Sequence, residues 1–216
     1  YVAINKPAGM LVHRSGIDRH ETVFAMQLLR DQIGQKVFPL HRLDKPTSGV
    51  LLFALSSEAA KAMAPAFEQH SIQKHYLAVV RGYAPEQGHI DHALKAIEDK
   101  HDDARRQKNK DAQEAATNYR RIAKIELPVS VDKYPQSRYS LVELNPQTGR
   151  RHQIRRHLKH IAHPIIGDVN YGKGTHNRYY ADELNCKRLL LHASSLEFAH
   201  PYTCLLYTSP SPRDGL

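Results

Sequence analysis

The sequence predicts an α+β fold, with a largely antiparallel mixed sheet and helices that flank it. Two observations predict this class. Segments in which apolar and polar residues alternate, as in a β-strand, outnumber segments with helical periodicity, and the links between them are of hairpin length. At 216 residues the chain is long enough to bury a sizeable core.

Seven segments have the character of strands. The first ends at the turn-rich sequence NKPAG of residues 5–9. Residues 50–55 are apolar throughout, which is typical of a buried strand. The predicted strands are 1–4, 37–40, 49–55, 74–80, 117–126, 138–144 and 189–198.

Three segments have the character of helices. Residues 22–33 carry apolar side chains at helical spacing, and Ser56 offers an N-cap for a second helix that ends near residue 69. In a third, predicted over 149–161, Ile154, Leu158 and Ile161 form an apolar stripe.

We expect one catalytic domain over residues 1–203, with a truncated N-terminus because the chain opens inside a strand without an initiator Met. Residues 95–111 mix charges of both signs with few apolar residues, and we expect a solvated, mobile excursion. Residues 204–216 contain Pro210 and Pro212, which cannot donate to a strand ladder. We expect this tail to be non-native or disordered.

The charge balance is basic. Lys and Arg total 31 against 22 Asp and Glu, a net charge of +9. This excess favours a polyanionic partner, of which nucleic acid is the commonest soluble one. A basic surface that serves only solubility is the alternative, and composition alone leaves both open.

The cysteine count and the apolar runs bear on location. Cys186 and Cys204 lie far apart and form no Cys-x-x-Cys pair, so neither a disulfide framework nor a structural zinc site is indicated. The run at 50–55 is far too short to span a bilayer. We expect a cytoplasmic protein without a membrane partner.

Motifs for metals and cofactors are missing from the sequence. The chain has 15 His residues but no His-Glu-x-x-His, and its glycines form neither a Walker loop nor a dinucleotide fingerprint. No Gly-x-Ser-x-Gly of a serine hydrolase occurs. We therefore expect no metal and no cofactor.

A polar loop between two predicted strands holds the main catalytic candidate. Asp44 lies in it, two residues before Pro46. A single loop Asp is most often a turn former, because its carboxylate binds nearby backbone amides. A loop held between two strands, however, can fix a carboxylate in a groove.

The third predicted helix is strongly basic. A solvated cationic face is one interpretation, and a face that binds phosphates is the other. An Arg beside the apolar stripe also needs an acidic partner, because an unpaired buried charge is costly. The basic residues are Arg150, Arg151, His152, Arg155, Arg156, His157, Lys159 and His160.

Five blocks, in order and spacing, resemble the motifs of RluA-type RNA pseudouridine synthases. The signature loop is HRLDKPTSG at 41–49. The other blocks are NKPAGMLVH at 5–13, KHYLAVVRG at 74–82, TGRRHQIR at 148–155 continued by HPIIGD at 163–168, and LHA at 191–193 with HP at 200–201. The resemblance covers residues 1–203 and departs in the charged excursion and the tail.

Within that family, three segments are most similar to bacterial members that modify tRNA at position 65. They are 145–148, 170–172 and 175–178. Members that act on ribosomal RNA share the core motifs and remain an alternative.

The resemblance implies an isomerase that converts uridine to pseudouridine in RNA, as a monomer and without a cofactor. Asp44 would be the catalytic carboxylate, Arg155 would pair with it, and Tyr76 would stack on the uracil. Arg42 would fill the gap left by the flipped base. The residues expected to bind RNA are His41, Arg42, Thr47, Ser48, Arg151, His152, Gln153 and Leu191.

Two alternatives come from other classes. A non-catalytic RNA-binding protein would use the basic helix without needing Asp44, Tyr76 and Arg155 together. A glycosidase would need a second acid near Asp44, and none is evident in the sequence.

Overall fold

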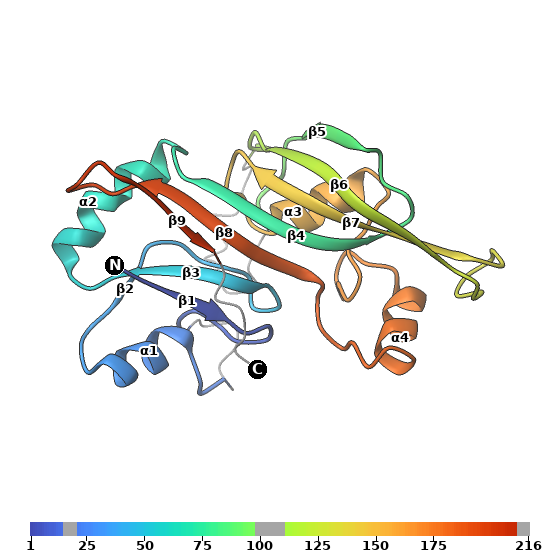
Figure 1. The fold of residues 1–216 in the computed structure, drawn as a ribbon, viewed down its shortest axis with the longest axis horizontal. Coiled ribbons are helices and arrows are strands. Elements are labelled where there is room, and N and C mark those ends of the chain that lie inside the picture. The colour runs from blue at the N-terminus through green and yellow to red at the C-terminus, as the bar shows by residue number, and fades with distance from the viewer. Residues whose placement is uncertain (15–20, 98–110, 211–216) are drawn as a thin grey trace. The chain divides into compact units, whose positions relative to one another are not determined.

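The fold comes from a computed structural model, which describes residues 1–14, 21–97 and 111–210 (Figure 1). The chain divides into two compact units. Unit 1 comprises residues 1–74, 95–112 and 193–216, and unit 2 comprises residues 75–94 and 113–192.

Unit 1 is built around a fully buried central strand. Strands β1 (Val2–Lys6) and β2 (Phe38–Pro39) both pair antiparallel with β3 (Ser48–Ala54), of which every residue is buried. Strand β8 (Leu191–Ala199) begins in unit 2 and continues into unit 1, where it pairs antiparallel with β9 (Leu206–Pro210).

Two helices belong to unit 1. Helix α1 (Ala25–Ile33) ends at Gly34, which has a left-handed backbone, and helix α2 (Ser57–Glu68) begins where the Ser56 hydroxyl accepts a hydrogen bond from the Ala59 N–H at 3.1 Å. That bond satisfies one of the amides that a helix leaves unpaired at its start. The core beneath contains Val50, Leu52, Met63, Ile72, Leu196 and Phe198.

Unit 2 contains four antiparallel strands, of which the last three form a meander and the last pairs back with the first. Its strands follow the order β4 (Gln73–Arg81), β7 (Ser137–Pro146), β6 (Ala116–Leu127) and β5 (Gln87–Asp91). A register shift in β6 between Arg121 and Ala123 marks a bulge. The long hairpin of β6 and β7 is visible in yellow-green and yellow (Figure 1).

Helices α3 (Gln153–His160) and α4 (Gly174–Asp182) complete unit 2. Ile154 and Leu158 of α3 lie in the core with residues of β4, β5, β6 and β7, as their helical spacing predicts. No helix within the described ranges is long and apolar enough to cross a membrane.

The predicted fold class is confirmed, because the strands pair largely antiparallel and helices accompany them. All seven predicted strands and all three predicted helices occur, with shifted ends. The third helix begins at Gln153 and not at residue 149, because His152 has a left-handed backbone, with φ at 55°. Strand β5 and helix α4 were not predicted.

The tail differs in part from expectation. Residues 206–210 pair with residues 195–199, so this part of the tail forms strand β9, and whether the tail is native stays a prediction. An edge strand tolerates a terminal proline such as Pro210. The charged excursion lies largely outside the described residues, and the boundaries of the predicted domain stay a prediction.

Candidate active site

The predicted catalytic loop occupies residues 41–47, between β2 and β3 of unit 1. A tight turn shapes it, because the Thr47 N–H donates to the Asp44 carbonyl oxygen at 3.0 Å. Asp44 itself is half-buried, at the start of this turn. The backbone therefore fixes the position from which the carboxylate projects.

Lys6 ties the loop to the first strand. Its side chain is fully buried, and its ammonium group donates to the carbonyl oxygens of Pro7 at 2.9 Å, Met10 at 2.8 Å and Lys45 at 3.2 Å. The Gly9 N–H donates to the same Lys45 oxygen at 2.9 Å. The block at 5–13 and the loop at 41–49 are thus held together beside Asp44.

The electrostatics of Lys6 reflect this location. Burial lowers the pKa of Lys6 to about 8, and the negative charge of Asp44 opposes that shift. A buried ammonium group that is surrounded by three carbonyl oxygens keeps its hydrogen bonds satisfied. It also places a positive charge near the predicted catalytic carboxylate.

His41 supports the loop from the other side. Its Nε2 accepts a hydrogen bond from the Leu52 N–H at 3.1 Å, and its ring stacks on Phe67 of α2 at a centroid distance of 5.4 Å. An imidazole nitrogen that accepts a hydrogen bond carries no proton, so the ring is neutral. Burial, followed by the charge of Lys74, lowers the pKa of His41 to about 3.

The loop residues that were predicted to bind RNA fall into two groups. Thr47 and Ser48 are 2% and 3% exposed, so their side chains belong to the interior. Arg42 is exposed next to Asp44, and its side chain has no hydrogen bond or ion pair in the part of the chain that the structure describes. Of these residues, Arg42 is the one placed to reach a ligand.

Gly49 is needed directly after the loop. Its φ of +114° is rare for residues with a side chain, and an added Cβ would overlap the backbone of Ala193 in β8. Only glycine lets the two segments approach so closely.

In unit 2, Arg155 forms a buried ion pair. Its Nε donates to Asp168 Oδ2 at 2.7 Å and its Nη2 to Asp168 Oδ1 at 2.8 Å, and both side chains are at most 2% exposed. The guanidinium group also lies 5.0 Å from the ring centre of Tyr171. Because the planar guanidinium group is hydrogen-bonded at two points, its orientation is fixed.

Asp168 joins this pair to the following turn. Its carboxylate also accepts hydrogen bonds from the backbone N–H groups of Asn170 and Tyr171, each at 3.0 Å. Burial raises the pKa of Asp168, but the hydrogen bonds and charge of Arg155 outweigh burial, so the pKa lies below its ordinary value. The carboxylate is therefore ionised, as its arginine partner requires.

Tyr76 lies on β4, where it pairs with Leu144 of β7. It is half-buried and packs against the core cluster that contains Ile154 and Leu191. Leu191 is 3% exposed, so it supports the cluster from β8. The Tyr76 side chain is thereby packed against the core of unit 2.

The start of α3 is held by side chains. Gln153 accepts hydrogen bonds from the Thr148 hydroxyl at 2.6 Å and the Arg150 N–H at 2.9 Å, and it donates to the Ala116 carbonyl and the Thr117 hydroxyl. All its hydrogen-bonding capacity serves the fold. His152 is hydrogen-bonded through Nδ1 to the Tyr171 hydroxyl at 3.0 Å.

The basic helix is therefore only partly a surface. Arg155 is 2% exposed and His157 is fully buried, with its Nε2 donating to the His92 carbonyl at 3.0 Å. Lys159 and His160 are exposed, and Arg150, Arg151 and Arg156 are half-buried. If the helix presented a uniform cationic face, all of these basic side chains would be exposed to solvent.

Two site residues had no predicted role, Lys6 and Asp168, although both lie inside motif blocks of the sequence. The signal that could have indicated Asp168 is that a buried Arg needs an acidic partner. Asp168 is that partner for Arg155. Asp44 belongs to unit 1, whereas Arg155 and most of β4 belong to unit 2. The meeting of Asp44 with Arg155 and Tyr76 stays a prediction.

Comparison with known proteins identifies the class. A profile of the family described as RNA pseudouridylate synthase matches residues 1–160. The chain belongs to this family of RNA-modifying isomerases, which confirms the resemblance seen in its motifs.

Two relatives are similar over nearly the whole chain. The tRNA pseudouridine synthase C of Vibrio parahaemolyticus is 57% identical over 203 residues, which cover 94% of this chain and 82% of that protein. The protein of the same name from Haemophilus ducreyi is 59% identical over 202 residues, covering 94% and 83%.

A solved structure shares the fold. Human RNA Pseudouridylate Synthase Domain Containing 1 has a TM-score of 0.68 and 26% identity, and the match covers 94% of this chain and 83% of that one.

In the described part of the chain, no group of three or more His, Cys, Asp or Glu residues is placed to hold a metal ion.

Proposed function

We propose that this protein converts a uridine of tRNA to pseudouridine, at position 65, as a cytoplasmic monomer. The observation that carries the substrate is the 57% identity over 203 residues to a tRNA pseudouridine synthase C. The position rests on the three sequence segments that resemble tRNA-modifying members.

The reaction is an isomerisation that balances without a co-reactant. The bond between N1 of uracil and C1′ of the ribose breaks, the base rotates, and a bond forms between C5 and C1′. The proton on C5 leaves and N1 takes up a proton. Asp44 starts the reaction, either as a nucleophile or as a base at the ribose.

The surroundings of Asp44 suit this role. Lys6 places a buried positive charge near it, and the Asp44–Thr47 turn holds its backbone. The buried positive charge attracts the carboxylate and helps to hold it in place beside the loop.

Arg155 and Tyr76 complete the proposed set. Asp168 holds the Arg155 guanidinium in one orientation, and the sequence motif that contains Arg155 supports its pairing with Asp44. Tyr76, anchored in the core of unit 2, would stack on the uracil and help to remove the C5 proton. Exposed Arg42 would occupy the space of the flipped nucleotide.

The test is a map of pseudouridine in tRNA. Unmodified tRNA transcripts are incubated with the purified chain, and pseudouridine is located by carbodiimide labelling and primer extension. A new stop at position 65, absent with Asp44→Asn, supports the proposal. Modification of ribosomal RNA but not tRNA would overturn the substrate, and binding without modification would indicate a non-catalytic RNA-binding protein.

A further inference from the structure

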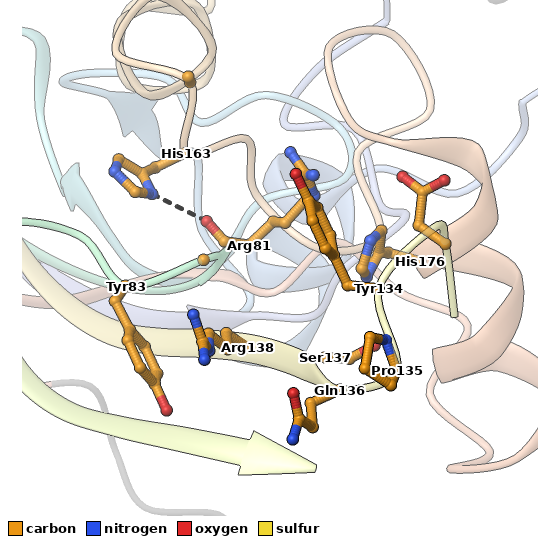
Figure 2. Close-up of a pocket in the computed structure, with 12 residues that line it drawn as sticks. Arg81, Tyr83, Tyr134, Pro135, Gln136, Ser137, Arg138, His163 and His176 are labelled. Carbon is orange, nitrogen blue, oxygen red and sulfur yellow. Dashed lines mark hydrogen bonds between the residues drawn. The ribbon is translucent and has the colours of Figure 1, made fainter. Parts of the chain in front are cut away.

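Unit 2 contains a cavity of about 500 Å³ that the proposed reaction does not use. Its wall comes from the end of β4, the loop between β6 and β7, the segment after α3, and α4. Figure 2 shows its lining side chains. This volume is within the range of small-ligand sites.

The cavity is separate from the predicted catalytic residue on the same strand. Arg81 lines it from the end of β4, five positions after Tyr76. Residues an odd number of positions apart on a strand point to opposite faces, and five positions span about 16 Å. None of the residues predicted for catalysis or RNA contact is among those that line this cavity.

Arg81 offers an uncommitted charge. Its backbone is fixed, because its carbonyl accepts a hydrogen bond from His163 Nδ1–H at 2.9 Å, drawn in Figure 2, and its N–H donates to the Pro164 carbonyl at 3.0 Å. Its guanidinium group makes no hydrogen bond or ion pair with any described residue. Five N–H donors are thus available at the cavity wall.

His176 of α4 presents a buried polar atom without a partner. The residue is 4% exposed, and its Nδ1 is hydrogen-bonded to the Tyr139 hydroxyl at 2.9 Å. Its Nε2 is buried and, among the described residues, has no partner. A buried nitrogen without a hydrogen bond is costly, so a ligand that supplies the missing hydrogen bond is favoured.

A carboxylate acceptor lies near these two groups. Asp132 lines the cavity, and its Oδ2 is paired with Lys173 Nζ at 3.2 Å. Burial and the charge of Arg81 lower the pKa of His176, and the charge of Asp132 opposes them. Arg81, Asp132 and His176 are therefore close enough to influence one another.

Aromatic rings supply a stacking surface. Tyr83 and Tyr134 both line the cavity. The Lys133 ammonium lies 5.2 Å from the ring centre of Tyr134, and the Arg138 guanidinium carbon lies 5.2 Å from that of Tyr83. Cations thus accompany the aromatic surfaces, as in sites that stack bases and bind their phosphates.

We propose that this cavity binds the base of an unpaired nucleotide of the substrate RNA. A nucleobase is flat, and its edge carries both hydrogen-bond donors and acceptors, which match the acceptor Asp132, the donor Arg81 and the imidazole nitrogen of His176. A bare phosphate has only acceptors, so it offers no donor to Asp132 and no flat face to the aromatic rings. The RNA origin of the base rests on the proposed function.

The direct test uses guanosine 5′-monophosphate, whose base edge offers both donors and acceptors, and ribose 5-phosphate, which lacks the base. Binding is measured by calorimetry, and the shift of the His176 ring resonances locates the ligand. We expect guanosine monophosphate to bind at least about tenfold more tightly than ribose 5-phosphate and to shift His176. Equal binding of the two compounds, or an unperturbed His176, would overturn the proposal.

Matched variants assign the site. Arg81→Gln should weaken guanosine monophosphate binding at least about tenfold, whereas Arg120→Gln, which removes the same charge from an exposed ion pair on β6, should not. Arg81 makes no hydrogen bond through its side chain, so the variant should melt like the wild type. If both variants weakened binding equally, the loss would come from the lower net charge of the protein and not from this cavity, which would overturn the site.

The RNA origin has its own test. With tRNA as substrate, Arg81→Gln should raise KM and leave kcat unchanged, because the cavity holds substrate away from the reacting atoms. An unchanged KM would overturn the RNA origin while leaving base binding intact. A wild type that forms no pseudouridine would defeat the proposed function alone, since guanosine monophosphate binding does not depend on it.

Discussion

At the scale of residues, several polar groups of the signature loop act as internal supports. His41 accepts from the backbone of β3, and Lys6 donates to three carbonyl oxygens around the loop. Thr47 and Ser48 are buried. The RNA contacts of His41, Thr47 and Ser48 stay predictions. Arg42 is exposed and is therefore placed to contact RNA.

The support by His41 predicts a pH effect. Its pKa is about 3 in the folded protein, below the ordinary 6.5, so folding favours the neutral ring. The stability from this group is present above pH ~6.5 and is lost as the pH falls towards 3, by up to about 1.4 kcal/mol per pH unit. His41→Gln keeps an acceptor and does not titrate.

Urea unfolding of both proteins between pH 7 and pH 4 measures this effect. The wild type should lose more stability than His41→Gln over that range, because other acid-sensitive groups are common to both and cancel. Parallel curves for the two proteins would contradict the neutral imidazole.

At the scale of elements, prediction succeeded where a local pattern determines the structure. The continuous apolar run of β3 and the Ser56 cap of α2 are examples. Helix α4 and strand β5 were missed because their sequences, GTHNRYYAD and QGHID, have weak local signals. Their positions depend on contacts with distant segments, such as the bond between His176 and Tyr139.

Helix α3 shows why part of the candidate site escaped prediction. A run of basic residues indicates a charged surface, but Arg155 and His157 are buried. Arg155 forms an ion pair with Asp168, and His157 is hydrogen-bonded to Thr117 and His92. The need of a buried Arg for an acid was foreseeable from the sequence. Which acid would satisfy it depended on the tertiary fold.

The Arg155–Asp168 pair predicts a large effect at this scale. Asp168→Asn should destabilise the protein by about 3–5 kcal/mol, because it removes one charge of a buried ion pair. Glu143→Gln, which breaks the exposed pair with Arg120, should cost no more than about 1 kcal/mol. Chemical unfolding measures both, and equal losses would contradict the structural weight given to the buried pair.

At the scale of the whole molecule, the net charge of +9 matches a polyanionic substrate. Membership of the RNA pseudouridylate synthase family indicates that this substrate is RNA. The C-terminal tail is one of the two segments that the family resemblance does not cover. Its strand β9 pairs with β8, but Leu205, Leu206 and Tyr207 remain 45–72% exposed.

Removal of residues 205–216 should therefore have a small effect. An edge strand with exposed side chains contributes about 1 kcal/mol, which corresponds to a decrease in Tm of about 2–4 °C for a chain of this size. Thermal unfolding of the shortened and intact chains compares them. A decrease of about 10 °C or more would show that the tail belongs to the core of the fold.

Asp44 is the residue on which the proposed chemistry depends most directly. Asp44→Asn exchanges one oxygen for nitrogen, so the turn at 44–47 and the hydrogen bonds of Lys6 should persist. The decisive measurement is single-turnover pseudouridine formation in tRNA by this variant, with its tRNA affinity and Tm determined in parallel. We expect turnover below about a hundredth of wild type, with affinity and Tm nearly unchanged. Turnover near the wild-type rate would contradict the catalytic role of Asp44.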